Sequence, residues 1–195
     1  MKKECPVPML QNDFEITALV DIYKELKPHC VLEIGSAHGG TLWGWITNAE
    51  KGTEITSVDL ISAHKIYGGR QGVIESRALW DGWANKAEVD LNIIEGDSNL
   101  DETAELVKEF APFDFIFIDG GHEYMSVATD FLLYWPMLRK GGVIAIHDIS
   151  YDLDHPHCIL VGKWWRDMNR AGFFGGDVTE IFKTLEDNGI GVIRK

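Results

Sequence analysis

Apolar residues recur along this chain with two different periods, one typical of helices and one typical of strands. Residues 13–28 carry apolar side chains at helical spacing, among them Ile16, Leu19 and Tyr23, and the segment closes on Pro28. A period of about 3.6 residues predicts an amphipathic helix that ends at the proline. The same period predicts helices within residues 41–49, 73–87, 101–110, 123–138 and 162–172. Pro136 should kink or end the helix within 123–138.

Short runs rich in apolar residues predict strands at residues 30–35, 54–60, 89–97, 113–119 and 141–149, of which the central ones are close to continuously apolar, and two weaker strands at 177–185 and 189–195. Strands that are apolar throughout are buried on both faces, as in a parallel sheet covered by helices. Five of them alternating with helices predict an α/β fold with a mostly parallel sheet. Ligands of such sheets bind beyond the carboxyl ends of the strands, so the polar residues there are the candidates for function.

Length, charge and cysteine content narrow the class of protein. With 195 residues we expect a single domain over 1–195, with a helical segment at 1–28 before a core at 30–195. No apolar run approaches the ~20 residues of a membrane span, and no signal-peptide pattern follows the N-terminal lysines, so we expect a cytoplasmic protein. A net charge of −13 disfavours nucleic acids and anionic membranes as partners. The three cysteines lack the spacing of a zinc site.

A glycine turn follows the first predicted strand. In "VLEIGSAHGG" the second glycine of the dinucleotide fingerprint G-x-G-x-x-G is replaced by Ala37, which hinders the close approach of a pyrophosphate. The stretch instead resembles motif I of class I S-adenosylmethionine-dependent methyltransferases, with Glu33, Gly35 and Gly39 matching and Ala37 in place of the middle glycine. This resemblance implies that Glu33, Gly35, Ser36, Ala37 and Gly39 bind S-adenosylmethionine. A tight turn without any ligand is the alternative.

Acidic residues follow the next two strands. Asp59 ends the second strand about twenty residues beyond the turn, where a carboxylate can accept both ribose hydroxyls of a nucleoside cofactor. Asp97 and Ser98 follow the third strand, at the position where this superfamily contacts the adenine. A helix N-cap is an equally good interpretation of Asp97 and Ser98.

Carboxylates also end the fourth and fifth strands, at Asp119 and Asp148. Neighbouring parallel strands lie about 4.8 Å apart, so these groups can converge on one point together with His147. Two acidic oxygens and an imidazole would repel or desolvate one another unless a cation lay between them, which predicts a divalent metal site. Polar turns and helix caps at both places are the alternative.

The segment 113–149 resembles the metal-dependent small-molecule O-methyltransferases of the catechol, macrocin and cephalosporin-hydroxylase-like group, and with motif I the resemblance covers 30–150. It implies a Rossmann-like, doubly wound, mostly parallel seven-stranded sheet with an antiparallel strand near the C-terminus. It also implies that Asp119, His147 and Asp148 bind Mg or Mn, that His122 is the catalytic base, and that Asp119 serves both catalysis and cofactor binding. In catechol-type enzymes the base is a lysine and the pair is Asp-Asn, so both histidines depart from that pattern. His147 in the pair would soften the metal site and favour manganese, iron or zinc over magnesium. A histidine base would titrate near neutral pH, whereas a lysine base needs a lowered pKa.

Two further sets of residues carry weaker expectations. The loop "DLDHPHC" at 152–158 could add a metal ligand or cover a polar substrate, although mobile loops of this composition are common. Trp164 and Trp165 should belong to the core. Trp43 and Trp45 are two apart and cannot share a helix face, so one of them could line the cofactor cleft.

Together these features predict methyl transfer from S-adenosylmethionine to a hydroxyl of a small polar acceptor, a sugar or a secondary metabolite. Three alternatives stay open: a metal-independent methyltransferase with His122 alone as base, a non-catalytic cofactor-binding protein, and a nicotinamide oxidoreductase. The sequence leaves the acceptor, the metal and a homo-oligomeric state undetermined. Acceptor specificity should reside in the loops at 61–72 and 150–160.

Overall fold

The computed structural model describes residues 2–60, 70–150, 159–175, 177–182 and 187–195, whose strands form one seven-stranded sheet. The strands are β1 (Cys30–Ile34), β2 (Glu54–Asp59), β3 (Asp90–Glu95), β4 (Phe113–Ile118), β5 (Leu138–His147), β6 (Asp177–Ile181) and β7 (Ile190–Arg194). The helices are α1 (Asp13–Leu26), α2 (Gly40–Asn48), α3 (Arg70–Ala87), α4 (Asp101–Lys108), α5 (Tyr124–Tyr134) and α6 (Ile159–Arg170), with short 3-10 turns η1 (Lys2–Glu4) and η3 (Trp135–Met137).

The strand order is β3-β2-β1-β4-β5-β7-β6. β1 to β5 are mutually parallel, and β7 runs antiparallel to both β5 and β6. The predicted α/β class and the antiparallel strand near the C-terminus are therefore confirmed. Because the winding of the sheet reverses between β1 and β4, the crevice for a ligand is expected at the carboxyl ends of these two strands.

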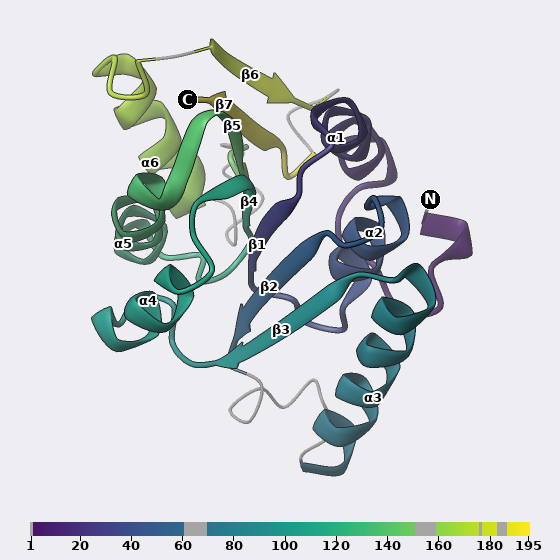
Figure 1. Cartoon of the computed structure of the whole chain (residues 1–195). Helices are drawn as coiled ribbons and strands as arrows, with labels where there is room; N and C mark the ends of the chain where they lie inside the picture. Colours follow the sequence, from purple (N-terminus) through teal and green to yellow (C-terminus); the bar gives the residue numbers. More distant parts are fainter. Residues whose placement is uncertain (1, 61–69, 151–158, 176, 183–186) are drawn as a thin grey trace.

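Helices cover both faces of the sheet: α1, α2 and α3 lie on one side and α4, α5 and α6 on the other (Figure 1). Each side has its own hydrophobic core. Alternate residues of β4 divide between them, since Phe115 and Phe117 face α1–α3 while Ile116 and Ile118 face α4–α6. This two-sided burial explains why apolar residues occupy consecutive positions of β4, on both faces of the sheet.

The segments α5, η3 and α6 show where the helical spacing of apolar residues predicted the structure correctly and where it did not. α5 ends at Tyr134 and η3 contains Pro136, as the proline predicted. The helical spacing of apolar residues in 123–138 also includes Met125 and Leu132, which are not buried, since they are 70% and 63% exposed. Trp164 and Trp165 of α6 are both buried, as predicted.

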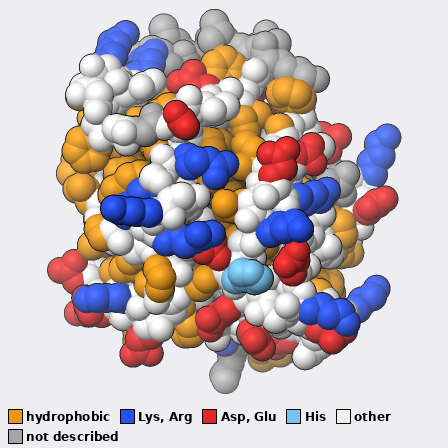
Figure 2. Space-filling view, turned by 45° about the horizontal axis from the view of Figure 1, so that its top comes forward, with side chains coloured by type: hydrophobic (Ala, Val, Ile, Leu, Met, Phe, Trp, Pro, Cys, Tyr) orange, Lys and Arg blue, Asp and Glu red, His pale blue; other side chains and the backbone are white. Residues whose placement is uncertain are grey.

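The surface carries charges of both signs. Figure 2 shows Lys and Arg side chains mixed with Asp and Glu side chains, and with apolar side chains between them, on the face that it presents. This mixture fits the acidic net charge of −13 and offers no broad basic area on that face. None of the described helices is long and apolar enough to cross a membrane.

Candidate cofactor cavity and metal centre

A cavity of about 850 Å³ lies at the carboxyl ends of the parallel strands, which is a usual size for a small-molecule site. It joins nearly all the site residues that the sequence predicted. Those that line it are Gly35, Ser36, Ala37, Asp59, Asp97, Ser98, Asp119, His122, His147 and Asp148. Glu33 and Gly39 do not line the cavity.

The glycine turn is held by the carboxylate after β2. The Oδ2 atom of Asp59 accepts the backbone N–H groups of Ser36 and Ala37 at 2.9 and 2.8 Å. Gly35 has a φ of +84°, and a Cβ there would lie 2.0 Å from the backbone oxygen of Asp119. Only glycine fits this position, because β1 and β4 approach so closely at their ends.

Glu33 lies beneath the turn, in a group of buried side chains that we call the glycine-turn cluster: Glu33, Ser36, Trp45 and Ser57. Its carboxylate accepts the Ser36 hydroxyl at 2.7 Å and the Trp45 indole N–H at 2.9 Å. Burial raises the pKa of Glu33 to about 7. The hydrogen bonds of Glu33 to Ser36 and Trp45 are therefore structural. The expectation that Trp43 or Trp45 lines the cleft is wrong, because neither reaches the cavity and Trp45 is buried against Glu33.

The residues after β3 form a turn that side-chain hydrogen bonds stabilise. The Oδ1 atom of Asp97 accepts the backbone N–H of Asn99 at 3.0 Å. α4 begins later, with Leu100 at its N-cap, so neither Asp97 nor Ser98 is the helix N-cap that the sequence left as an alternative. The Asn99 side chain donates to Asp130 at 2.7 Å, and burial raises the pKa of Asp130 to about 6.

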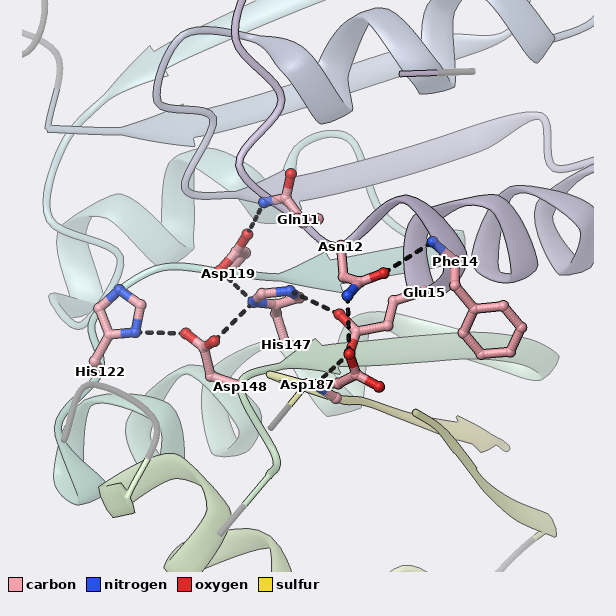
Figure 3. A network of polar contacts seen from close by, with 10 residues as sticks. Gln11, Asn12, Phe14, Glu15, Asp119, His122, His147, Asp148 and Asp187 are labelled. Carbon is pink, nitrogen blue, oxygen red and sulfur yellow. Dashed lines mark hydrogen bonds and ion pairs between the residues drawn. The ribbon is translucent and has the colours of Figure 1, made fainter. Parts of the chain in front are cut away.

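At the other end of the cavity lie Asp119, His147 and Asp148. With Glu15, which contacts His147 but does not line the cavity, they form what we call the acid–histidine cluster (Figure 3). The Nδ1 atom of His147 lies 3.0 Å from Asp148 Oδ1 and 3.4 Å from Asp119 Oδ1. Its Nε2 atom lies 3.8 Å from Glu15 Oε2. His147 is therefore surrounded by three carboxylates from three different elements.

Strand register explains this convergence. Ile118 of β4 pairs with Ile146 of β5, so Asp119 and His147 follow at the same level of the sheet. His147 is two residues beyond Ala145, which faces the α1–α3 core, so its ring also points to α1. Asp148 follows with a φ of +64°, a left-handed conformation that Asp tolerates better than most residues.

The cluster is electrostatically unbalanced. Glu15, His147 and Asp148 are 0, 6 and 3% exposed, yet Glu15 Oε2 and both ring nitrogens of His147 have no partner with hydrogen-bond geometry among the described residues. Burial lowers the pKa of His147, but the charge of Asp119 and the other acids outweighs this and raises it well above its usual value. Burial raises the pKa of Asp148, and the two histidines more than reverse that effect.

The donor set fits a divalent cation. One ligand atom from each of Asp119, His147 and Asp148 lies within 4.8 Å of the others. Ligands about 2.2 Å from one ion lie up to about 4.4 Å apart, so a small closure would suffice. Buried atoms without partners are the second sign of fit, because such atoms are rare in native proteins.

His122 lies at the mouth of the cluster, with its side chain 51% exposed. Its Nδ1 atom is 2.6 Å from Asp148 Oδ2, and this hydrogen bond raises the pKa of His122. The other ring nitrogen lies on the side away from Asp148 (Figure 3). An imidazole oriented by a carboxylate through one nitrogen leaves the second nitrogen for proton transfer.

Gln11 and Glu15 were missed by the sequence analysis. The Gln11 side chain donates to Asp119, and Glu15 lies on the buried face of α1 with Ile16 and Leu19. A signal was present: Glu15 is four residues before Leu19, so it is a charged residue within an apolar helix face. The predicted role of the 152–158 loop lies outside the described residues, as does most of the 61–72 loop.

The reversed strand order with an antiparallel β7, and a cavity beyond β1 and β4, define a Rossmann-like methyltransferase fold. A family model described as "Methyltransferase domain" matches residues 32–149, more than half of the chain. The chain belongs to this family. The match runs from within β1 to the end of β5 and includes both the glycine turn and the predicted metal ligands Asp119, His147 and Asp148.

Individual relatives agree with this family. The mycinamicin VI 2''-O-methyltransferase of Micromonospora griseorubida is 33% identical over 63 residues, which are 32% of this chain but only 16% of that protein. A putative caffeoyl-CoA O-methyltransferase from Staphylococcus aureus superposes over 100% of this chain and 88% of its own, with a TM-score of 0.68 and 18% identity. The MycE methyltransferase of the mycinamycin pathway, solved with Mg and SAH, matches 91% of this chain and 48% of its own, with a TM-score of 0.58 and 18% identity.

Proposed function

We propose that this protein transfers the methyl group of S-adenosylmethionine to a hydroxyl of a small polar acceptor, assisted by a divalent cation at Asp119, His147 and Asp148. The observation that carries the proposal is the single cavity that joins the glycine turn to the acid–histidine cluster. A cofactor on the turn and an ion in the cluster would then share one site. The Mg and SAH bound together in MycE support the same arrangement.

The charge of the cavity favours a cationic cofactor. Asp59, Asp97, Asp119, Glu123 and Asp148 line it, and its lining in the described part of the chain includes no Lys or Arg. Such a wall would repel the phosphates of a nicotinamide dinucleotide but attract the positive sulfonium of S-adenosylmethionine. In our proposal Gly35, Ser36 and Ala37 form the floor beneath the cofactor, Asp59 accepts its ribose hydroxyls, and Asp97 and Ser98 contact its adenine.

The residues of the cluster would orient the acceptor and remove its proton. A bound divalent cation would act as a Lewis acid that lowers the pKa of the acceptor hydroxyl. The acceptor oxygen forms a bond to the methyl carbon while the carbon–sulfur bond breaks, giving S-adenosylhomocysteine. The hydroxyl proton passes to the outer nitrogen of His122, while Asp148 holds the ring through Nδ1. Holding the three reacting atoms in line supplies much of the acceleration.

One alternative has a specific observation in its favour. The 2.6 Å contact between His122 and Asp148 is by itself an oriented base, which would serve a methyltransferase without a metal. The unpartnered atoms around His147 favour the metal-assisted form, because the pair alone leaves them unexplained. A cofactor-binding protein without transferase activity is the second alternative.

The exposure of the site and the relatives of the chain support the proposed class of acceptor. His122 is half exposed, so the acceptor would approach from solvent rather than enter a closed core. A sugar hydroxyl or a hydroxyl of a secondary metabolite fits, and the mycinamicin relative acts at a 2''-oxygen.

Three measurements on one preparation test the proposal. Titration calorimetry should show binding of S-adenosylmethionine, and Mn²⁺ should bind with one ion per chain. Release of S-adenosylhomocysteine should then be screened over glycosides, macrolide aglycones and catechols, with Mn²⁺ or Mg²⁺ and with excess EDTA. Full turnover in EDTA would favour the metal-free alternative. Cofactor binding with no turnover of any acceptor, and no change in His122→Ala, would favour the non-catalytic protein.

A further inference from the structure

Glu15 is the one buried charge of the acid–histidine cluster that no predicted role includes. It lies in the first turn of α1, is fully buried, and reaches the cluster from an element that precedes the family match. Its Oε1 atom accepts the backbone N–H of Gly189 at 2.8 Å. Its Oε2 atom has no hydrogen-bond partner among the described residues and lies 3.8 Å from His147 Nε2 (Figure 3).

The two ring nitrogens of His147 face different carboxylates. Nδ1 faces Asp119 and Asp148, where the ion would bind, and Nε2 faces Glu15. A histidine that ligates a metal usually donates its other N–H to a carboxylate or a carbonyl, which fixes the orientation of the ring. Glu15 is the carboxylate that faces Nε2.

We propose that Glu15 is a positioning residue that holds the His147 ring with Nδ1 turned to Asp119 and Asp148, and thereby gives the site its affinity for cations that accept nitrogen ligands. The inference rests on the proposed cation site. Imidazole ligands suit Mn²⁺, Co²⁺ or Zn²⁺ better than Mg²⁺, which prefers oxygen. Without Glu15 the site would keep two carboxylates and lose a well-oriented nitrogen.

A purely structural role for Glu15 is the competing explanation, because its bond to Gly189 ties α1 to the turn before β7. Two variants separate the roles. Glu15→Gln keeps an oxygen for the Gly189 N–H and keeps the packing, but it removes the charge that faces Nε2. Asn12→Ala removes the side-chain oxygen that accepts the Phe14 N–H at 3.0 Å and the contact from Asn12 Nδ2 to Asp187 at 2.9 Å, so it loosens the same helix start without touching His147.

The test measures ion binding and ligation on the whole chain, without an acceptor. Mn²⁺ and Mg²⁺ affinities are titrated for the wild type, Glu15→Gln, Glu15→Ala and Asn12→Ala, and pulsed EPR of bound Mn²⁺ detects the coupling to an imidazole nitrogen. We expect the Glu15 variants to bind Mn²⁺ about 10- to 100-fold more weakly, as for other outer ligands of metal sites. Mg²⁺ affinity should change less, and the nitrogen coupling should weaken or vanish. Asn12→Ala should behave as the wild type.

The outcomes distinguish this inference from the function on which it rests. The role of Glu15 alone would be overturned if the wild type bound Mn²⁺ and the Glu15 variants matched it in three respects. These are the Mn²⁺ affinity, the ratio of Mn²⁺ to Mg²⁺ affinity, and the nitrogen coupling. Equal losses in Asn12→Ala would also overturn it, in favour of the structural role. A wild type that binds neither ion would overturn the cation site and this inference with it. Thermal unfolding by circular dichroism checks that each variant is folded.

Discussion

Two groups of buried polar side chains lie close together in this fold, and they differ in how completely their atoms are paired. In the glycine-turn cluster, both carboxylate oxygens of Glu33 accept hydrogen bonds, one from Ser36 and one from Trp45. In the acid–histidine cluster, three carboxylates surround one histidine, and Glu15 Oε2 and both nitrogens of His147 are without hydrogen-bond partners in the described structure.

This difference is the one expected between a structural cluster and a cluster that binds a ligand. A buried carboxylate that accepts two hydrogen bonds can be tolerated as part of the fold, whereas three carboxylates around one imidazole hold more negative charge than the ring can balance, which is costly when the groups are buried. The cost is most simply offset by a positive charge between the carboxylates. Burial of polar groups alone would have suggested a ligand-binding site in both clusters. The two clusters differ in their atoms without hydrogen-bond partners among the described residues.

Removing charge from the acid–histidine cluster should have the largest effect. Asp148→Asn keeps a residue that tolerates the φ of +64°, so the backbone should not change. It loses a charged ligand and the carboxylate that orients His122, so we expect methyl transfer to fall by about 1000-fold, or about 4 kcal/mol in activation free energy. Mn²⁺ affinity should fall as well, measured by calorimetry.

Glu33→Gln is the matched control, since it neutralises a carboxylate of the satisfied cluster. Its Mn²⁺ affinity should stay within threefold of the wild type. If the two variants lost Mn²⁺ affinity equally, the distinction between paired and unpaired clusters would not predict function.

The spacing of apolar residues in the sequence predicted the strands and the polar residues at their ends. Continuous apolar runs located β1 to β5, and the ends of those strands located Asp59, Asp119 and Asp148, because parallel strands end at one edge of a sheet. Asp119, His147 and Asp148 could be grouped in advance as candidate metal ligands for the same reason.

Contacts between distant segments could not be predicted in this way. Glu15 approaches His147 only because α1 packs on this face of the sheet and begins beside the end of β5, and no local pattern encodes that packing. The structure also separates two motif-I residues that the sequence treated alike. Gly35 lines the cavity, whereas Glu33, two residues earlier on the same strand, is fully buried under the turn.

The second prediction concerns pH and the glycine-turn cluster. Burial raises the pKa of Glu33 from 4.5 to about 7, so the folded state binds this proton more tightly than the unfolded state. The stabilisation is complete below pH ~4.5 and is lost as pH rises through ~7, amounting to on the order of 3 kcal/mol. Urea unfolding from pH 5 to 8 should show this decline in the wild type relative to Glu33→Gln. Parallel curves for the two proteins would contradict it.

The third prediction tests the contrast between the two clusters through the thermal stability of the protein. A cation that binds only the folded state at 100 times its Kd adds about 2.7 kcal/mol. For a chain of 195 residues this corresponds to a rise in Tm of about 5 to 10 °C. Differential scanning calorimetry with Mn²⁺ should show the rise in the wild type and in Glu33→Gln, but not in Asp148→Asn. A rise of equal size in Asp148→Asn would place the ion elsewhere.

The smallest effect is expected from Asp59→Asn, at the cofactor end of the cavity. Asp59 Oδ2 accepts the Ser36 and Ala37 N–H groups, and the Asn oxygen can still accept them, so the turn should persist. The charge that would bind the ribose hydroxyls is lost, and a hydrogen bond to a charged group contributes about 1.5–3 kcal/mol. We therefore expect S-adenosylhomocysteine to bind at least 10-fold more weakly by calorimetry, with Mn²⁺ affinity unchanged. A fall in Mn²⁺ affinity would instead show that the two ends of the cavity are energetically coupled. The ion would then depend on Asp59, a carboxylate that binds the glycine turn.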